Sequence, residues 1–209
     1  MSLIVCVMTL ALVGCEDDLA TGNSGSINGH DYVDLGLPSG KKWATCNVGA
    51  NSPEKKGNYY AWGEITTKSE YTKDNSLTYM KNFSDISGNP NYDVARAKWG
   101  GSWRMPTKEE MKELVQNCIW KWITQNNADG YKVIGSNGNS IFLPAAGCCT
   151  STPRYVSERG YYWSSSPVPF TVGSDNYDAY HLSFTSDGRG VYEGDAMRYI
   201  GRTVRPISD

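Results

Sequence analysis

The sequence has no apolar run long enough to cross a bilayer as a helix, and it has no excess of basic residues. The apolar run at residues 3–14 covers about a dozen positions, whereas a membrane-spanning helix needs about 20. Lys and Arg together number 20 against 22 Asp and Glu, so the net charge is −2. We therefore expect no nucleic-acid partner and no basic surface for binding to lipid headgroups.

Residues that support acid–base, nucleophilic or zinc chemistry are also scarce. The two histidines, His30 and His181, lie far from any nucleophile motif, and the serines of "YWSSS" lack the G-x-S-x-G frame. No C-x-x-C pair and no cysteine–histidine spacing suits zinc. We therefore expect no catalytic residue, no metal site and no cofactor, and a protein that is not an enzyme.

The N-terminal apolar run ends in "LVGC", where Cys15 follows small and apolar residues. This is the pattern of a bacterial lipoprotein signal, which is cut before a cysteine whose thiol then takes a diacylglycerol. No Lys or Arg precedes the run, so an ordinary secretory signal or a buried N-terminal helix is the alternative. We expect a signal peptide at residues 1–14 and lipidation at Cys15, with this lipid as the only membrane contact.

The segment after Cys15, "EDDLATGNSGS", is acidic and then small and polar, with too little apolar surface to fold. We expect residues 15–27 to form a flexible tether and residues 28–209 to form a single domain. The acidic cluster resembles the surface-export signal of Bacteroidetes lipoproteins. It implies a lipid-anchored protein of the outer membrane that is exposed at the cell surface.

The pattern of the remaining chain predicts an α+β domain of short antiparallel strands, one main helix and long loops. "TKEE" forms a capping box that starts a helix at Thr107. Its predicted apolar stripe is Met111, Leu114, Val115, Cys118 and Trp122. A shorter helix that ends at Gly100 is expected in "NYDVARAKWGG", and hairpins are expected at 32–48 and around the Asn137-Gly138 turn. Further strands are expected at 161–165, at 179–184 with a possible return through 191–192, and in "GRTVRPI".

Tyr (14) and Trp (7) are abundant, whereas Phe numbers only 4. Three tryptophans, Trp62, Trp99 and Trp103, are expected to fill the core beneath long loops, although a sugar-stacking platform is an alternative. Glu64 and Arg104 are a candidate buried pair. In "RGYYWSSSP", alternation predicts that one of each neighbouring pair of side chains faces inward and that the serines form the exposed end of the strand.

Four cysteines follow the signal: Cys46, Cys118, Cys148 and Cys149. An exported domain can oxidise them, and the adjacent pair cannot easily bond to itself. We expect one of Cys148 and Cys149 to pair with Cys118 or Cys46.

Several phrases together resemble the Fibrobacter succinogenes major paralogous domain of Bacteroidetes lipoproteins. They are "YVDLGLPSGKKWATCNVGA", "YYAWGE", "WGGSWRMPTKEEMKELVQNCIW", "GNSIFLPAAG", "GYYWSSS" and "GRTVRPI", in that order from about residue 30 onwards. The resemblance implies a C-type-lectin-like fold, which the formylglycine-generating enzyme shares. The paired C-terminal cysteines of that enzyme are missing, since the last cysteine is Cys149. The calcium-holding E-P-N or Q-P-D and W-N-D motifs of sugar-binding lectins are missing too, although "DNYD" at 175–178 offers oxygen donors.

Domains of this kind are sometimes diversified between a "GYYWSSS"-like strand and a terminal strand, which here enclose residues 167–201. This interval is rich in the residue types that adaptable binding surfaces use. The candidate ligand-binding residues are Asp175, Asn176, Tyr177, Tyr180, His181, Arg189, Tyr192, Glu193, Arg198 and Tyr199. We expect them to bind an extracellular protein or glycan; a structural or adhesive subunit of a surface assembly is the alternative.

Overall fold

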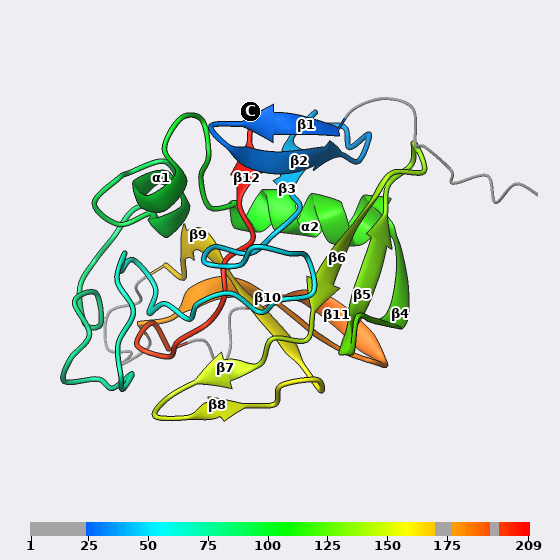
Figure 1. The fold of residues 1–209 in the computed structure, drawn as a ribbon. Coiled ribbons are helices and arrows are strands. Elements are labelled where there is room, and N and C mark those ends of the chain that lie inside the picture. The colour runs from blue at the N-terminus through cyan, green and yellow to red at the C-terminus, as the bar shows by residue number, and fades with distance from the viewer. Residues whose placement is uncertain (1–23, 170–176, 193–196) are drawn as a thin grey trace, which may run out of the picture.

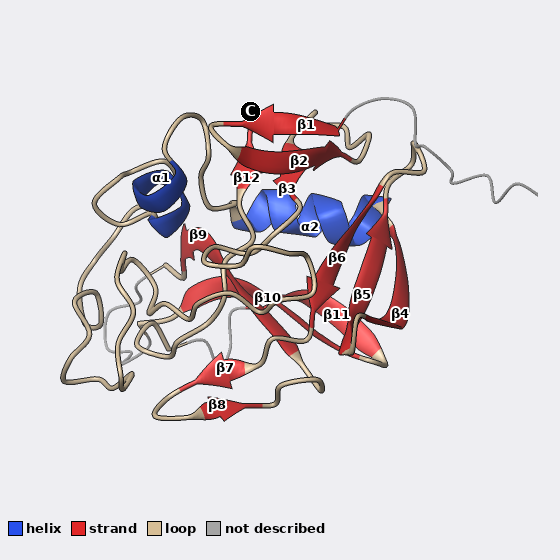
Figure 2. Ribbon diagram, viewed as in Figure 1, coloured by secondary structure: helices blue, strands red, loops and turns tan. Residues whose placement is uncertain are grey.

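The computed structural model describes residues 24–169, 177–192 and 197–209. Figure 1 shows short strands grouped into several sheets around one central helix, and Figure 2 shows the long loops that connect them. All of the strand pairs within these sheets are antiparallel. The predicted α+β class and its short antiparallel strands are confirmed. None of the helices in these three ranges is long and apolar enough to cross a membrane.

The first sheet has the order β1-β2-β3-β12 and joins both ends of the described chain. Its strands are β1 (Ser24–Ile27), β2 (His30–Asp34), β3 (Lys42–Ala44) and β12 (Ile207–Ser208). The predicted hairpin is confirmed, with Val33 opposite Trp43. Strand β1 lies inside the segment expected to be a tether at 15–27, so the folded domain already includes these four residues. The four residues of β1 are ordered by backbone hydrogen bonds to β2, and this pairing could not be predicted from the polar composition of the segment.

The second sheet, β4-β5-β6, consists of two consecutive hairpins. It contains β4 (Ile119–Gln125), β5 (Ala128–Ile134) and β6 (Ser140–Pro144). The hairpin at Asn137-Gly138 is confirmed, and Gly138 adopts the positive φ of 85° that this turn needs. The β4–β5 hairpin was not predicted. It turns at Asn126-Asn127, where both asparagines have positive φ, a conformation that Asn tolerates better than most residues.

Helix α2 (Lys108–Asn117) begins at the predicted capping box, with Thr107 and Glu110 satisfying each other's backbone N–H groups. The helix ends earlier than its apolar stripe suggests. Cys118 is already extended and Trp122 lies in β4, so the stripe is shared between a helix and a strand. The shorter helix α1 (Val94–Trp99) ends at Gly100, as predicted.

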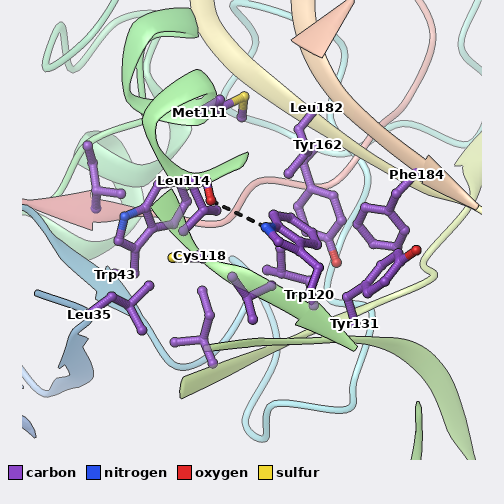
Figure 3. Close-up of a cluster of buried hydrophobic side chains, with 14 of the residues drawn as sticks. Leu35, Trp43, Met111, Leu114, Cys118, Trp120, Tyr131, Tyr162, Leu182 and Phe184 are labelled. Carbon is purple, nitrogen blue, oxygen red and sulfur yellow. Dashed lines mark hydrogen bonds between the residues drawn. The ribbon is translucent and has the colours of Figure 1, made fainter. Parts of the chain in front are cut away.

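The main core surrounds α2, which lies between the first sheet and the sheet β11-β10-β9 (Figure 1). That third sheet contains β9 (Gly160–Pro167), β10 (Ala179–Thr185) and β11 (Gly188–Tyr192). Met111 and Leu114 of α2 pack in one cluster with Trp43, Tyr162 and Phe184. In Figure 3, Trp120 donates through Nε1 to the Leu114 carbonyl at 3.3 Å. The aromatic rings therefore hold the end of the helix to two sheets.

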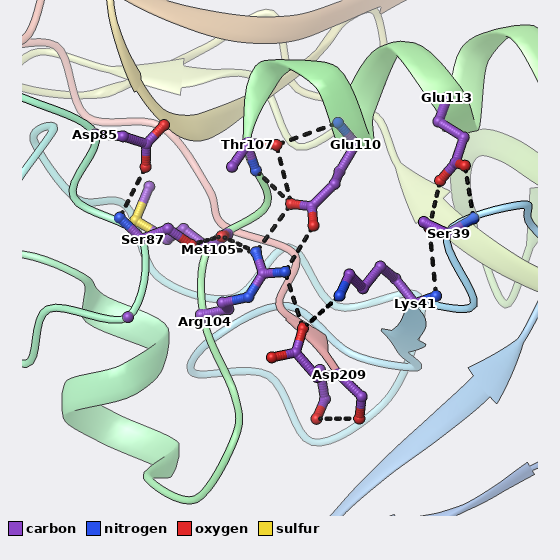
Figure 4. Close-up of polar contacts among 12 residues, drawn as sticks. Ser39, Lys41, Asp85, Ser87, Arg104, Met105, Thr107, Glu110, Glu113 and Asp209 are labelled. Carbon is purple, nitrogen blue, oxygen red and sulfur yellow. Dashed lines mark hydrogen bonds and ion pairs between the residues drawn. The ribbon is translucent and has the colours of Figure 1, made fainter.

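The expected core role of Trp62, Trp99 and Trp103 is confirmed, because all three are buried in a second cluster. The expected pairing of Glu64 with Arg104 is wrong. Glu64 forms an ion pair with Lys68. Arg104 contacts Glu110 at 2.6 Å, and Figure 4 shows Asp209 on its other side at 3.1 Å. Glu110, in the first turn of the helix, already places a carboxylate next to Arg104, so Arg104 does not need Glu64 as a partner.

Strand β9 is buried on both faces, so alternation failed as a guide to exposure. Tyr162 packs in the core around α2, whereas Trp163 packs in the second cluster. Ser164, Ser165 and Ser166 are also buried, which contradicts the expected exposed end of the strand. Ser164 donates to the Tyr180 carbonyl and Ser166 to the Asp85 carboxylate. These serines join strands and loops inside the protein.

All four described cysteines are free thiols, so the expected disulfide is wrong for this structure. Cys118 packs in the core around α2, and Cys149 packs in a third small cluster with Tyr59 and Tyr71. Each of these two thiols is therefore an apolar packing group. Cys148 and Cys149 form β7 (Cys148–Cys149), which pairs with β8 (Pro153–Arg154).

A fully buried arginine, Arg205, connects the C-terminal segment to the first two sheets. Its Nε donates to Asn47 Oδ1 at 2.8 Å, and its Nη1 donates to the Ala44 and Thr45 carbonyls at 3.0 and 2.8 Å. Its Nη2 donates to the Phe142 carbonyl at 2.9 Å. The planar fork of the guanidinium group makes these contacts simultaneously, which a lysine ammonium could not do.

We predict that Arg205→Met lowers the free energy of unfolding by about 3–5 kcal/mol, because it leaves several buried oxygen acceptors without a donor. Urea denaturation followed by fluorescence measures this change. Arg154→Met, at an exposed position of β8, serves as the control and should cost less than about 0.5 kcal/mol. Equal stability of Arg205→Met and the natural chain would show that Arg205 has no such role.

Candidate functional site

The β9–β10–β11 sheet has one face turned towards α2 and one face turned away from it. Tyr162, Leu182 and Phe184 pack in the core around α2. Side chains one residue along each strand lie on the opposite face. The register places His181 next to both Trp163 and Tyr192 on this second face, and Ser183 next to Tyr161.

The C-terminal segment runs along the free edge of β9 and extends this second face. Trp163 N donates to the Thr203 carbonyl at 3.0 Å, and Thr203 N donates back to the Tyr161 carbonyl at 3.3 Å. Gly201 exchanges two backbone hydrogen bonds with Cys149 of β7. The sheet face away from α2 is thus bordered by the C-terminal segment and the β7–β8 hairpin.

A pocket of about 500 Å³ opens on this face. We call it the C-terminal pocket, and it is lined by Cys148, Tyr155, Arg159, Tyr161, His181, Ser183, Tyr192, Ile200 and Arg202. Its volume is within the range of small-molecule sites.

His181 and Arg202 are buried residues at the pocket lining, each 3% exposed. The guanidinium carbon of Arg202 lies 4.9 Å from the centre of the Tyr161 ring and 4.6 Å from that of Trp163. His181 Nδ1 is buried and has no hydrogen-bond partner among the described residues. Burial and, secondarily, the Arg202 cation hold the pKa of His181 far below its ordinary value, although a backbone hydrogen bond with Tyr192 opposes this. The imidazole is therefore neutral at physiological pH.

Exposed side chains form the rim of the C-terminal pocket. Tyr155 is 45% exposed and Tyr192 is 50% exposed. Arg159 lies on the Tyr155 ring, with its guanidinium carbon 4.9 Å from the ring centre, and it donates to the Tyr161 hydroxyl at 3.3 Å. These contacts hold an arginine and two tyrosines together at the pocket entrance.

Cys148 also lines the C-terminal pocket, but its thiol does not have the character of a nucleophile. Burial raises its pKa, and this effect exceeds the opposing effects of Arg202, Arg154 and Arg159. The thiol is therefore protonated at neutral pH, whereas nucleophilic cysteines react as thiolates.

Two further predicted residues gather at a different place. The rings of Tyr177 and Tyr199 both contact Tyr79, with centres 5.7 and 5.3 Å apart respectively. We call these three residues the tyrosine cluster. Leu77 and Met80, on the same 76–81 loop as Tyr79, are more than 60% exposed.

The other predicted residues do not share one surface. Arg198 is buried over Trp62 and donates to the Asp178 and Lys81 carbonyls, so it is not displayed as the sequence suggested. Arg189 lies over the Trp120 ring, and Tyr180 lies beneath the Lys108 ammonium group. Asp175, Asn176 and Glu193 lie outside the described residues.

Much of the C-terminal pocket was not predicted from the sequence. Tyr155 and Arg159 precede the interval that was singled out, and Tyr161 was assigned to the strand frame. Arg202 was treated as part of the terminal strand. The alternation of Tyr161 with Tyr162 in β9, matched to that of His181 with Leu182 in β10, is the signal that indicates the shared face.

A second pocket of about 480 Å³ is lined by residues from the first half of the chain, between His30 and Trp99. The stacked rings of His30 and Trp99, with centres 3.8 Å apart, form part of its lining. Trp99 is already buried against Trp103 in the second cluster. This second pocket is lined by fewer charged and aromatic residues than the C-terminal pocket. None of its lining residues is among the predicted ligand-binding residues.

The described residues contain no cluster of His, Cys, Asp or Glu that could hold a metal ion. Comparison of the chain with protein-family models, with curated proteins and with solved structures finds no match in any of the three.

We predict that His181 makes the protein less stable in mild acid. The unfolded histidine takes up a proton as the pH falls through 6.5, whereas the folded ring stays neutral. The folded state therefore loses stability below pH 6.5, by about 2 kcal/mol on reaching a pH of about 5.

Urea denaturation at both pH values tests this prediction. His181→Gln should lose less stability on acidification than the natural chain, by about the same 2 kcal/mol. His30→Gln should retain most of the acid effect, because His30 is only partly buried. Equal acid sensitivity of His181→Gln and the natural chain would contradict the neutral buried state.

Proposed function

We propose that this protein is a surface lipoprotein whose single C-type-lectin-like domain binds an external ligand in the C-terminal pocket. The observation that supports this most strongly is the pocket itself. It brings the predicted residues His181 and Tyr192 together with three arginine and tyrosine side chains from other segments, Tyr155, Arg159 and Arg202. Mixed aromatic and polar linings with exposed rims are typical of ligand sites.

The proposal of a C-type-lectin-like fold is supported by the places of the quoted phrases in the structure. "YVDLGLPSGKKWATCNV" contains the β2–β3 hairpin, "GYYWSSS" forms most of β9, and "TVRPI" carries Arg205. These phrases supply core residues and, through Tyr161, part of the pocket lining, whereas His181 and Tyr192 lie between them. Such an arrangement suits a fixed frame with an adaptable surface.

The surface location of the protein is proposed from the sequence features at its start. Cys15 would carry the lipid, and the acidic segment after it would direct the protein to the outer face of the outer membrane. Metabolic labelling with palmitate tests the anchor: Cys15→Ser should abolish incorporation and release the protein from the membrane fraction. Persistent labelling of this variant would refute the anchor at Cys15.

The binding site is tested with the chain from residue 15 onwards, carrying Cys15→Ser, on arrays of glycans and surface proteins. We expect Tyr192→Ala to weaken binding of an array ligand by about tenfold or more, because an exposed aromatic rim residue is lost. Tyr199→Ala, in the tyrosine cluster, is the matched control and should leave binding unchanged. Addition of EDTA should have no effect, since none of the described lining residues is the Asp or Glu that a calcium site normally uses.

A different pattern would favour the second candidate, an adhesive or structural subunit of a cell-surface assembly. The observation in its favour is the exposed apolar loop with Leu77 and Met80, which adjoins the tyrosine cluster. Exposed apolar patches of this kind mark protein–protein contacts. If Tyr199→Ala abolishes binding while Tyr192→Ala does not, the C-terminal pocket is not the site and the adhesive role is supported.

A further inference from the structure

The C-terminal pocket has a positive character in a protein of net charge −2. Arg159 and Arg202 both line it, and none of its described lining residues is Asp or Glu. Arg202 is buried at its lining, whereas Arg159 stands at the exposed rim. Two guanidinium groups at one small hollow can bind a carboxylate or sulfate group through charge-assisted hydrogen bonds.

The buried imidazole of His181 adds a second requirement for the ligand. His181 Nδ1 is buried and makes no hydrogen bond to another described residue. A neutral imidazole has one nitrogen that donates and one that accepts. A buried ring nitrogen at a pocket lining calls for a hydrogen-bond partner, and a hydroxyl group on the ligand can either donate to it or accept from it.

Tyrosine rings supply the third element of recognition. Tyr155 and Tyr192 stand exposed at the rim, and Tyr161 contacts both Arg159 and Arg202. Aromatic faces of this kind pack against the flat carbon–hydrogen face of a ring that carries polar groups at its edge.

We propose that the C-terminal pocket binds an acidic saccharide, with its carboxylate or sulfate at Arg159 and Arg202 and a neighbouring hydroxyl hydrogen-bonded to His181 Nδ1. The sugar ring then packs against the tyrosines of the rim. This inference rests on the proposed function, since it names the ligand class of the same site. An acidic peptide is the less suitable ligand, because it offers no saturated ring with a hydroxyl next to the anionic group.

The probes are methyl glucuronide, methyl glucoside, glucose 6-sulfate and N-acetyl-diglycine, titrated into the chain from residue 15 onwards with Cys15→Ser. The first two differ only in having a carboxylate or a hydroxymethyl group. We expect the glucuronide to bind with a Kd on the order of 1 mM and the glucoside at least about tenfold more weakly. Glucose 6-sulfate shows whether a sulfate can replace the carboxylate in binding. N-acetyl-diglycine shows whether a carboxylate binds without a sugar ring.

Nitrogen NMR of labelled histidine follows the titration at His181. The Nδ1 signal should move on saturation with the glucuronide, because a ligand hydroxyl forms a hydrogen bond with this nitrogen. Arg159→Gln should weaken glucuronide binding by about tenfold and leave binding of the glucoside unchanged. Arg154→Gln is the matched control, since Arg154 is exposed on β8 and does not line the pocket. It should change affinity by less than about twofold.

Equal binding of glucuronide and glucoside would overturn the inference, as would dipeptide binding as tight as that of the glucuronide. The absence of a saturable shift with either acidic sugar would overturn it too. If array binding in these cases still depends on Tyr192, the proposed function stands and only the ligand class is wrong. If array binding is independent of Tyr192, the proposed site itself fails.

Discussion

The buried guanidinium group of Arg205 is the interaction on which the rest of the structure depends. Arg205 is 1% exposed, and its hydrogen bonds are accepted by main-chain carbonyls of β3 and β6 and by the Asn47 amide oxygen. A buried cation held mainly by carbonyl dipoles is stable only if the carbonyls stay in place. Arg205 thereby holds together β3, β6 and the C-terminal segment, which are far apart in the sequence. This contact also fixes the C-terminal segment in its position beside β9.

The same segment carries two more buried arginines, and each has a different role. Arg198 lies over Trp62 and donates to backbone carbonyls, so it orders the loop that leads to the terminal strand. Arg202 lies over Trp163 and Tyr161 and lines the C-terminal pocket. Because the backbone of Arg202 also pairs with Tyr60, its position does not depend on the rim. The pocket therefore has a rigid base with exposed aromatic side chains above it.

Local signals in the sequence predicted local structure well. The capping box located the start of α2, the Asn-Gly pair located the β5–β6 turn, and Gly100 ended α1. Exposure was harder to predict, because both faces of β9 are covered by segments distant in the sequence. The buried serines after Trp163 and the ion pairs of Arg104 depend on such long-range contacts. Of the candidate site, His181 and Tyr192 could be chosen from the sequence, whereas Arg159 and Arg202 required the pairing of β9 with its neighbours.

The most direct test of this account is a crystal structure of the domain soaked with methyl glucuronide. We expect the sugar to occupy the C-terminal pocket, with its carboxylate within about 3 Å of a guanidinium nitrogen and its ring against Tyr155 or Tyr192. Sugar bound in the second pocket, beside His30 and Trp99, or at the tyrosine cluster, with none in the C-terminal pocket, would contradict the proposed site.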